Sequence, residues 1–199
     1  MKIIIITGGS GTGKSTLGKN LQHRLSNSYL LSTDNYYKTG FFPNLLSKLL
    51  NSYFDKIISL DKRLIKDDIC EILTNGSTSH YYEYDFKRKK KKKKIINLMK
   101  IDHLIIEGIF SLEIIDFLAL KDYLLIRLKI DKKYCRERVF KRDKLERNKN
   151  NNNNDFNNGW LIYENKEKKF YSKSNSKELI FKNTPNLKTI SKKISTMNS

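Results

Sequence analysis

A lysine and a hydroxyl residue close a glycine-rich segment near the start of the chain. Residues 8–16 read GGSGTGKST, and their spacing satisfies the pattern G-x-x-x-x-G-K-[ST]. The backbone N–H groups of such a loop converge on phosphate oxygens, and the N-terminus of the following helix favours negative charge. Lys14 would reach the β- and γ-phosphates of a nucleotide, and the Ser15 hydroxyl would ligate Mg²⁺. The residues predicted to bind the phosphates are Gly8, Gly9, Ser10, Gly11, Thr12, Gly13, Lys14, Ser15 and Thr16.

Two flanking segments distinguish a phosphate-binding loop from a chance glycine turn. Residues 2–7 are apolar and β-branched, as in a buried strand, and residues 14–25 repeat leucine with helical spacing. A strand before the loop and a helix after it are the context that the motif requires. The sequence therefore predicts a phosphate-binding loop.

Two acidic residues lie at the ends of other predicted strands. Asp34 comes directly after residues 29–33, and Glu107 lies near the end of the apolar stretch 103–108. In a parallel sheet both would face the crevice at the carboxyl ends of the strands. Asp34 could hold Mg²⁺ through water or accept a hydroxyl proton, or it could cap a helix. Glu107 could be the second acidic residue of a magnesium site, or it could cap the turn between the strand and the next helix.

A strongly charged helix is predicted from residue 132 to about residue 147. Its arginines could close over a nucleotide and neutralise charge on a transferred phosphoryl group. The alternative is a solvated helix with ion pairs between successive turns. The arginines are Arg136, Arg138, Arg142 and Arg147.

The remaining segments continue the alternation of strands and helices. Such alternation indicates an α/β fold, a parallel sheet with helices on both faces, in a single domain over residues 1–199. The asparagine run 150–154 is interpreted as a flexible break. Further helices are expected at residues 43–54, 61–73, 111–118 and 160–171, and further strands at residues 78–86, 122–130 and 178–181.

The formal net charge is +19, and part of it comes from the unbroken cationic run at residues 87–94. A basic surface favours anionic partners, which include nucleic acid, anionic membrane and nucleotide phosphates. The run contains no aromatic residue, which argues against a platform that stacks single-stranded bases. We therefore expect an exposed, solvated loop, with nucleic-acid binding as the alternative.

The chain has no apolar stretch of the length needed to cross a bilayer, and its apolar start leads into the glycine turn instead of a cleavage site. Cys70 and Cys135 are far apart and form no C-x-x-C pair, which suits a reducing compartment. We expect a cytoplasmic protein without a membrane partner. The sequence does not decide the oligomeric state.

Taken in order over residues 2–149, these landmarks resemble the uridine kinase/phosphoribulokinase-like family of P-loop kinases. The family pairs the segment GGSGSGKT with D-x-Y-Y after the second strand, and this chain has GGSGTGKS and Asp34-Asn35-Tyr36-Tyr37. Other family segments are PVYDF, EG and R-D-x-x-E-R-G-R. Their counterparts are EYDF at residues 83–86, EG at residues 107–108 and RDKLERNK at residues 142–149.

The resemblance implies the P-loop NTPase fold, with a small lid at about residues 136–158 and a β-hairpin inserted at the acceptor site. It also implies transfer of a phosphoryl group from ATP, with Mg²⁺, to the 5′-hydroxyl of a pyrimidine ribonucleoside. The implied catalytic residues are Asp34, as the base near that hydroxyl, and the cations Lys14, Arg142 and Arg147. The implied substrate-binding residues are Asp55 at the ribose and Tyr84 and Phe86 as walls of the base pocket. The implied metal ligands are Ser15, Glu107 and Asp34.

The chain departs from the family where the acceptor is recognised. Lys89 stands where the family has a histidine that reads the pyrimidine edge, and Ile57 and Ile58 replace a proline and an aspartate. A site built to hydrogen-bond one acceptor loses discrimination when those groups change. Three hypotheses follow: a pyrimidine ribonucleoside kinase, a related kinase for another riboside or a sugar phosphate, and a nucleotide-dependent nucleic-acid-binding protein.

Overall fold

Four successive isoleucines, Ile3–Ile6, form the middle of strand β1 (Lys2–Gly8). Side chains of a strand point alternately to its two faces, so Ile4 and Ile6 enter one buried cluster and Ile5 enters the other. All three side chains are fully buried. A strand buried in this way requires helices on both faces of its sheet.

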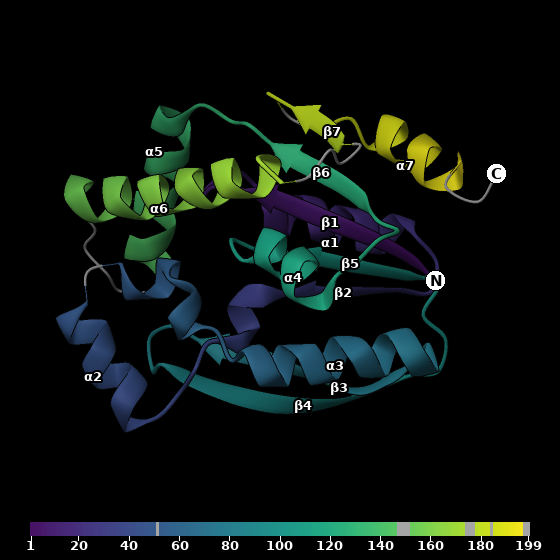
Figure 1. Ribbon diagram of the computed structural model, residues 1–199, viewed down its shortest axis with the longest axis horizontal. Helices are drawn as coiled ribbons and strands as arrows, with labels where there is room; N and C mark the ends of the chain where they lie inside the picture. The colour runs from purple at the N-terminus through teal and green to yellow at the C-terminus, as the bar shows by residue number, and fades with distance from the viewer. Residues whose placement is uncertain (51, 147–151, 174–177, 184, 197–199) are drawn as a thin grey trace.

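The computed structural model describes residues 1–50, 52–146, 152–173, 178–183 and 185–196. Its main sheet has parallel strands in the order β2-β5-β1-β6-β7, with β1 at the centre (Figure 1). The other strands are β2 (Ser28–Ser32), β5 (His103–Glu107), β6 (Leu124–Leu128) and β7 (Glu178–Phe181). The predicted parallel sheet is confirmed.

Helices cover both faces of this sheet, as predicted. The helices that share a buried cluster with Ile4 and Ile6 are α1 (Lys14–Arg24) and α7 (Leu187–Ser195). The helices that share the cluster of Ile5 are α3 (Lys62–Asn75), α4 (Ser111–Leu118) and α6 (Asn153–Tyr171). Two further helices, α2 (Phe41–Leu49) and α5 (Lys132–Glu146), lie toward the end of the sheet where the parallel strands finish (Figure 1).

An antiparallel hairpin of β3 (Thr78–Asp85) and β4 (Lys90–Leu98) lies beside α3 (Figure 1). The prediction of an exposed loop for the cationic run 87–94 is wrong for its larger part, because Lys90–Lys94 belong to β4. The aromatic strand β3 supplies the hydrogen-bonding partner that the lysine sequence alone does not reveal. Long lysine side chains can also lay their aliphatic stems on aromatic rings.

Lys91 shows how a lysine is accommodated on the inner face of the hairpin. Its ammonium group lies 5.5 Å from the ring centroid of Tyr82 and 3.3 Å from the Asp61 carboxylate. The Lys91 side chain is 12% exposed, whereas Lys92, Lys93 and Lys94 are exposed. Within the run, Lys91 therefore contacts the core, whereas Lys92, Lys93 and Lys94 lie on a solvated outer surface.

The asparagine run contributes to α6. The side chain of Asn152 accepts a hydrogen bond from the backbone N–H of Asp155 at 2.7 Å, so α6 begins at Asn153 and not at residue 160. Asparagine is a favourable helix N-cap, and the predicted flexible break is wrong for residues 152–154. The rest of the run, residues 150 and 151, lies outside the described residues.

Other boundaries also differ from the prediction. The helix expected at residues 43–54 is α2, which ends at Leu49, followed by the short 3₁₀ turn η2 (Tyr53–Asp55). The sequence gives no prediction of a helix where α7 lies. That helix is short, and its two buried residues, Ile190 and Ile194, are surrounded by lysine and polar residues.

Tyr36, Asp68 and His80 form a buried polar cluster between three elements. The Tyr36 hydroxyl donates to Asp68 Oδ2 at 2.7 Å, and His80 Nε2 lies 3.3 Å from Asp68 Oδ1. Tyr36 ends the 3₁₀ turn η1 (Thr33–Tyr36), Asp68 lies in α3 and His80 lies in β3. The cluster ties the segment that follows β2 to both α3 and the hairpin.

Asp68→Ala should destabilise the protein by about 1–3 kcal/mol, because it leaves the buried Tyr36 and His80 polar groups without their shared partner. The free energy of unfolding in urea measures this loss. Asp67→Ala is the matched control on the same helix, since its carboxylate is largely exposed, and a change within about 0.5 kcal/mol is expected. Equal effects of the two substitutions would contradict a structural role for the cluster.

Candidate active site

The glycine-rich loop leaves β1 at the topological switch point of the sheet, where β1 has β5 on one side and β6 on the other. Ligands of doubly wound sheets bind at this position. Gly11 and Gly13 have φ angles of +83° and +96°, which favour glycine. A Cβ atom at Gly11 would collide with the carbonyl group of Cys135 in α5, whereas one at Gly13 would meet no atom within 4 Å. The loop is therefore packed against α5 on one side and open in front of Gly13.

Lys14 begins α1 with its side chain buried. Its ammonium group donates to the backbone oxygen of Gly9 at 2.9 Å and is within electrostatic reach of Glu107 and Asp34. Burial lowers the pKa of Lys14, and the two carboxylates oppose that shift. The positive charge is thus held inside the loop, beside Asp34, which comes after β2, and Glu107, which ends β5.

Glu107, Asp34 and Ser15 bring two carboxylates and a hydroxyl together. Ser15 Oγ donates to Glu107 Oε1 at 3.1 Å, and Glu107 is 3% exposed. Burial raises the pKa of Glu107, and the nearby charge of Asp34 raises it further. Asp34 Oδ1 is buried and has no hydrogen-bond partner. Oxygen ligands of this kind suit Mg²⁺, so the donor set fits that ion.

These protein atoms alone do not make a complete metal cage. In the described part of the chain no group of three or more His, Cys, Asp or Glu side chains could hold a metal ion. A magnesium ion bound through one or two carboxylates usually completes its coordination with substrate phosphates and water. A Cβ atom on Gly13, next to Lys14 and Ser15, would meet no atom within 4 Å, so the loop is open at this point.

A cavity of about 520 Å³ lies next to the loop. The predicted site residues that line it are Ser10, Asp34, Asp55, Phe86 and Arg142. Tyr84 is buried behind Phe86, with the two ring centroids 5.0 Å apart. The structure therefore brings the predicted base, the acceptor contacts and one predicted lid cation to one cavity. Arg147 lies outside the described residues.

Arg142 reaches the cavity from α5 with its charge paired. The guanidinium contacts Asp143 Oδ1 through Nε at 2.8 Å and Nη2 at 2.7 Å. Asp143 is buried, whereas about a third of the Arg142 side chain is exposed. This ion pair joins neighbouring residues instead of successive turns of the helix, and the Arg142 side chain also lines the cavity.

Helix α6 contributes residues that the sequence analysis missed. A Cβ atom on Gly9 would lie 2.7 Å from the Trp160 ring, so this ring covers the glycine loop. A Cβ atom on Gly159 would lie 2.6 Å from Asp55 Oδ2, so the α6 backbone approaches the predicted ribose contact. Gly159 and Trp160 line the cavity. In the sequence, only the adjacent pair Gly159-Trp160 could indicate this contact with the loop. The resemblance ends at residue 149 and implies no role for the pair.

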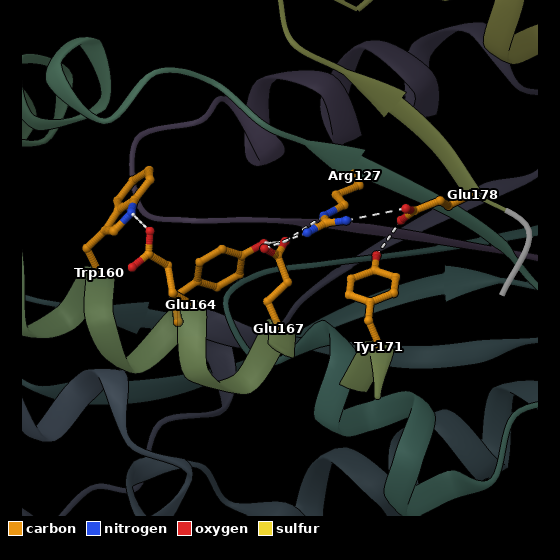
Figure 2. Close-up of polar contacts among 7 residues, drawn as sticks. Arg127, Trp160, Glu164, Glu167, Tyr171 and Glu178 are labelled. Atoms are coloured by element: carbon orange, nitrogen blue, oxygen red, sulfur yellow. Dashed lines mark hydrogen bonds and ion pairs between the residues drawn. The ribbon is translucent and has the colours of Figure 1, made fainter. Parts of the chain in front are cut away.

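Arg127 of β6 holds α6 against the sheet (Figure 2). Its guanidinium contacts Glu167 of α6 through both Nε and Nη2 at 2.6 Å and Glu178 of β7 at 3.4 Å. The Tyr171 hydroxyl donates to Glu178, and the Tyr171 ring lies 4.2 Å from the guanidinium carbon. Burial opposes the charge of Arg127, but the hydrogen bond and charge of Glu167 outweigh it and raise its pKa. This paired contact fixes α6 to the strand beside β1.

Lys89 also lines the cavity, from the turn between β3 and β4. Its ammonium group donates to Ser47 Oγ at 2.8 Å and lies 5.8 Å from the ring centroid of Phe54. Lys48 and Lys87 also line the cavity. At the position where the family has a histidine, this chain therefore places an ammonium group in the cavity lining.

Two curated proteins that are similar to this chain are both named uridine kinase. The uridine kinase of Clostridium novyi (strain NT) is 29% identical over 122 residues, which are 60% of this chain and 58% of that protein. The uridine kinase of Macrococcus caseolyticus (strain JCSC5402) is 32% identical over 113 residues, 56% of this chain and 54% of that protein. The resemblance to uridine kinases is confirmed. The chain spans little more than half the length of these curated relatives, and no protein-family model matches it.

Solved structures identify the fold. A putative fructose transport system kinase from Silicibacter sp. TM1040 has a TM-score of 0.62 at 18% identity and covers 90% of this chain and 89% of its own. Deoxyadenosine kinase from M. mycoides, with bound dATP, has a TM-score of 0.56 at 15% identity and covers both chains fully. The fold is that of the P-loop kinases, as predicted. Across the described residues, no helix is long and apolar enough to span a membrane.

Trp160 should report nucleotide binding, because it is the only tryptophan of the chain and its ring covers Gly9. We expect ATP with Mg²⁺ to change its fluorescence in a saturable way. Lys14→Met should weaken that binding by at least about tenfold, since the loop lysine contacts the β- and γ-phosphates. Lys19→Met, on the exposed side of α1, is the control and should bind like the wild type. An unchanged affinity in Lys14→Met would contradict the assignment of the loop.

Proposed function

We propose that this protein is an ATP- and Mg²⁺-dependent kinase that transfers a phosphoryl group to a hydroxyl group of a small molecule. One observation carries the proposal. Asp34, with a buried carboxylate oxygen that has no partner, faces the same cavity of about 520 Å³ as Arg142 and Asp55, directly beside the glycine loop. The names of the curated relatives support the same reaction.

The glycine loop, residues 8–16, would bind the nucleotide phosphates through its backbone N–H groups. Lys14 would leave its contact with Gly9 and reach the β- and γ-phosphates. Ser15, Glu107 and Asp34 would hold Mg²⁺, which when bound offsets the charge of the phosphates. The buried position of Lys14 strengthens its attraction to phosphate, because little water competes there.

Asp34 would orient the acceptor hydroxyl and accept its proton as the phosphoryl group is transferred. Arg142 would exchange part of its contact with Asp143 for the charge that develops on the transferred group. Arg147, which lies outside the described residues, would add a second cation to the site. Phosphoryl transfer depends mainly on the positioning of the reactants and on the stabilisation of charge, and the residues around the cavity would supply both.

The 5′-hydroxyl of a pyrimidine ribonucleoside is the acceptor that the relatives named uridine kinase support. Asp55 would contact the ribose hydroxyls. Phe86, with Tyr84 behind it, would provide an aromatic wall for the base. Asp55 and Phe86 line the cavity, and Tyr84 packs against Phe86.

Asp34→Asn should lower kcat by about a hundredfold or more, because the amide cannot accept the hydroxyl proton. The measurement is phosphoryl transfer from ATP with Mg²⁺ to a panel of ribonucleosides, deoxynucleosides and sugar phosphates. Asp67→Asn, an exposed carboxylate on α3, is the control and should retain wild-type turnover. ATP binding without transfer to any acceptor would refute the kinase proposal.

A second acceptor class is favoured by one observation in the cavity. Lys89, with Lys48 and Lys87, gives the acceptor end a set of ammonium groups, where a histidine would be expected for a pyrimidine reader. Ammonium groups only donate hydrogen bonds and attract anionic oxygens. Another riboside or a sugar phosphate is therefore the second candidate acceptor.

Lys89→Met distinguishes the two acceptor classes. If the acceptor is anionic, kcat/KM for it should fall by roughly tenfold, the effect of losing one charge-assisted hydrogen bond, and the loss should shrink at high salt. If uridine is the acceptor and does not contact Lys89, its kcat/KM should change less than about threefold. Lys92→Met, an exposed lysine of the adjoining strand β4, is the control.

A further inference from the structure

Helix α6 carries a second contact with the acceptor side of the site. Lys166, two turns beyond Gly159, donates from its ammonium group to the backbone oxygen of Asp55 at 2.8 Å. The same ammonium group lies 2.9 Å from Glu113 Oε1 of α4 and 4.1 Å from the ring centroid of Phe110. The Lys166 side chain is 16% exposed, and that of Glu113 is 21% exposed. A lysine so well buried is uncommon unless it is paired.

Helix α6 contacts Asp55 at two points. Lys166 bonds its backbone oxygen, while the backbone of Gly159 lies against its carboxylate. Asp55 ends the one-turn segment η2, whose internal bonds are Asp55 N–H to Ser52 and Lys56 N–H to Tyr53, at 2.9 and 3.1 Å. A turn of this length has little stability of its own. The contacts from α6 therefore fix where the Asp55 carboxylate points.

We infer that Lys166 is a positioning residue for the acceptor site, acting on Asp55 through the backbone of η2. The inference rests on the proposed kinase function, in which Asp55 contacts the acceptor. An alkyl side chain of similar length would fill the space without bonding the Asp55 oxygen. The Glu113 carboxylate attracts the ammonium group and helps to direct it, because the two groups lie 2.9 Å apart and are both mostly buried.

A positioning residue of the acceptor site and a residue that only stabilises the fold would affect different properties. Lys166 reaches neither the glycine loop nor Asp34 in any contact of the described residues. Its loss should therefore act on acceptor binding and leave nucleotide binding unchanged. A helix anchor alone would instead affect both substrates, because Trp160 of α6 also covers the loop.

The test compares Lys166→Met with Lys168→Met, an exposed lysine on the same helix. In Lys166→Met we expect hydrogen exchange at the Asp55 and Lys56 amides to rise by about tenfold. The acceptor KM should also rise by about tenfold, the size expected for losing a charge-assisted bond, with the ATP affinity from Trp160 fluorescence unchanged. Lys168→Met should match the wild type, and Lys166→Arg should restore most of the acceptor affinity.

Several outcomes would overturn the inference. Unchanged exchange at the two amides would show that Lys166 does not hold η2, whatever the kinetics. Faster exchange with equal losses of acceptor and ATP affinity, or with no rescue by Lys166→Arg, would make the residue a structural anchor only. A wild type that binds ATP but phosphorylates no acceptor refutes the kinase proposal itself, and the positioning role falls with it even if the exchange data show that Lys166 holds the turn.

Discussion

The burial of β1 on both faces is the constraint on which the site depends. Ile4, Ile5 and Ile6 lie in the core, so the strand cannot shift without breaking contacts with helices on both sides. The glycine loop leaves this fixed strand, and its neighbour β5 ends in Glu107, in register with Ile6. The distance between the loop and the carboxylates is therefore set by the sheet and not by the loop. A cradle of backbone N–H groups is useful only when it is held in this way.

Charges around the site are arranged so that each is costly without its partner. Lys14, Glu107 and Asp34 are drawn together at the carboxyl ends of the strands, where burial shifts the pKa of Lys14 downward and that of Glu107 upward. A bound nucleotide with its metal ion would bring both signs of charge to this group. Such sites gain affinity from desolvated charges that the protein alone leaves poorly compensated.

Much of the fold follows from local sequence signals. The apolar β-branched runs predict β1 and β5, and the position of Asp34 and Glu107 after such runs predicts that they meet. The strand of lysines in β4 is not predictable in this way, because its partner is the aromatic strand β3 and the pairing is a tertiary contact.

The contribution of α6 to the site was also beyond the sequence. Gly159, Trp160 and Lys166 are separated from Gly9 and Asp55 by more than a hundred residues, and nothing in their spacing indicates those contacts. The sequence thus predicts the residues that handle phosphate, which belong to a short motif. It does not predict those that shape the acceptor side, which come from separate elements.

The lysines of β4 have one more consequence, for contacts between copies of the chain. One edge of β4 pairs with β3, and within the described ranges no strand pairs with the other edge. An open edge of this kind can recruit a strand from a second molecule, and the exposed Ile95 and Met99 would favour such contact. Two copies aligned along β4 would place rows of five lysines about 5 Å apart, so mutual repulsion opposes the pairing. The cationic run thus disfavours edge-to-edge pairing of two hairpins, whether or not it binds another partner.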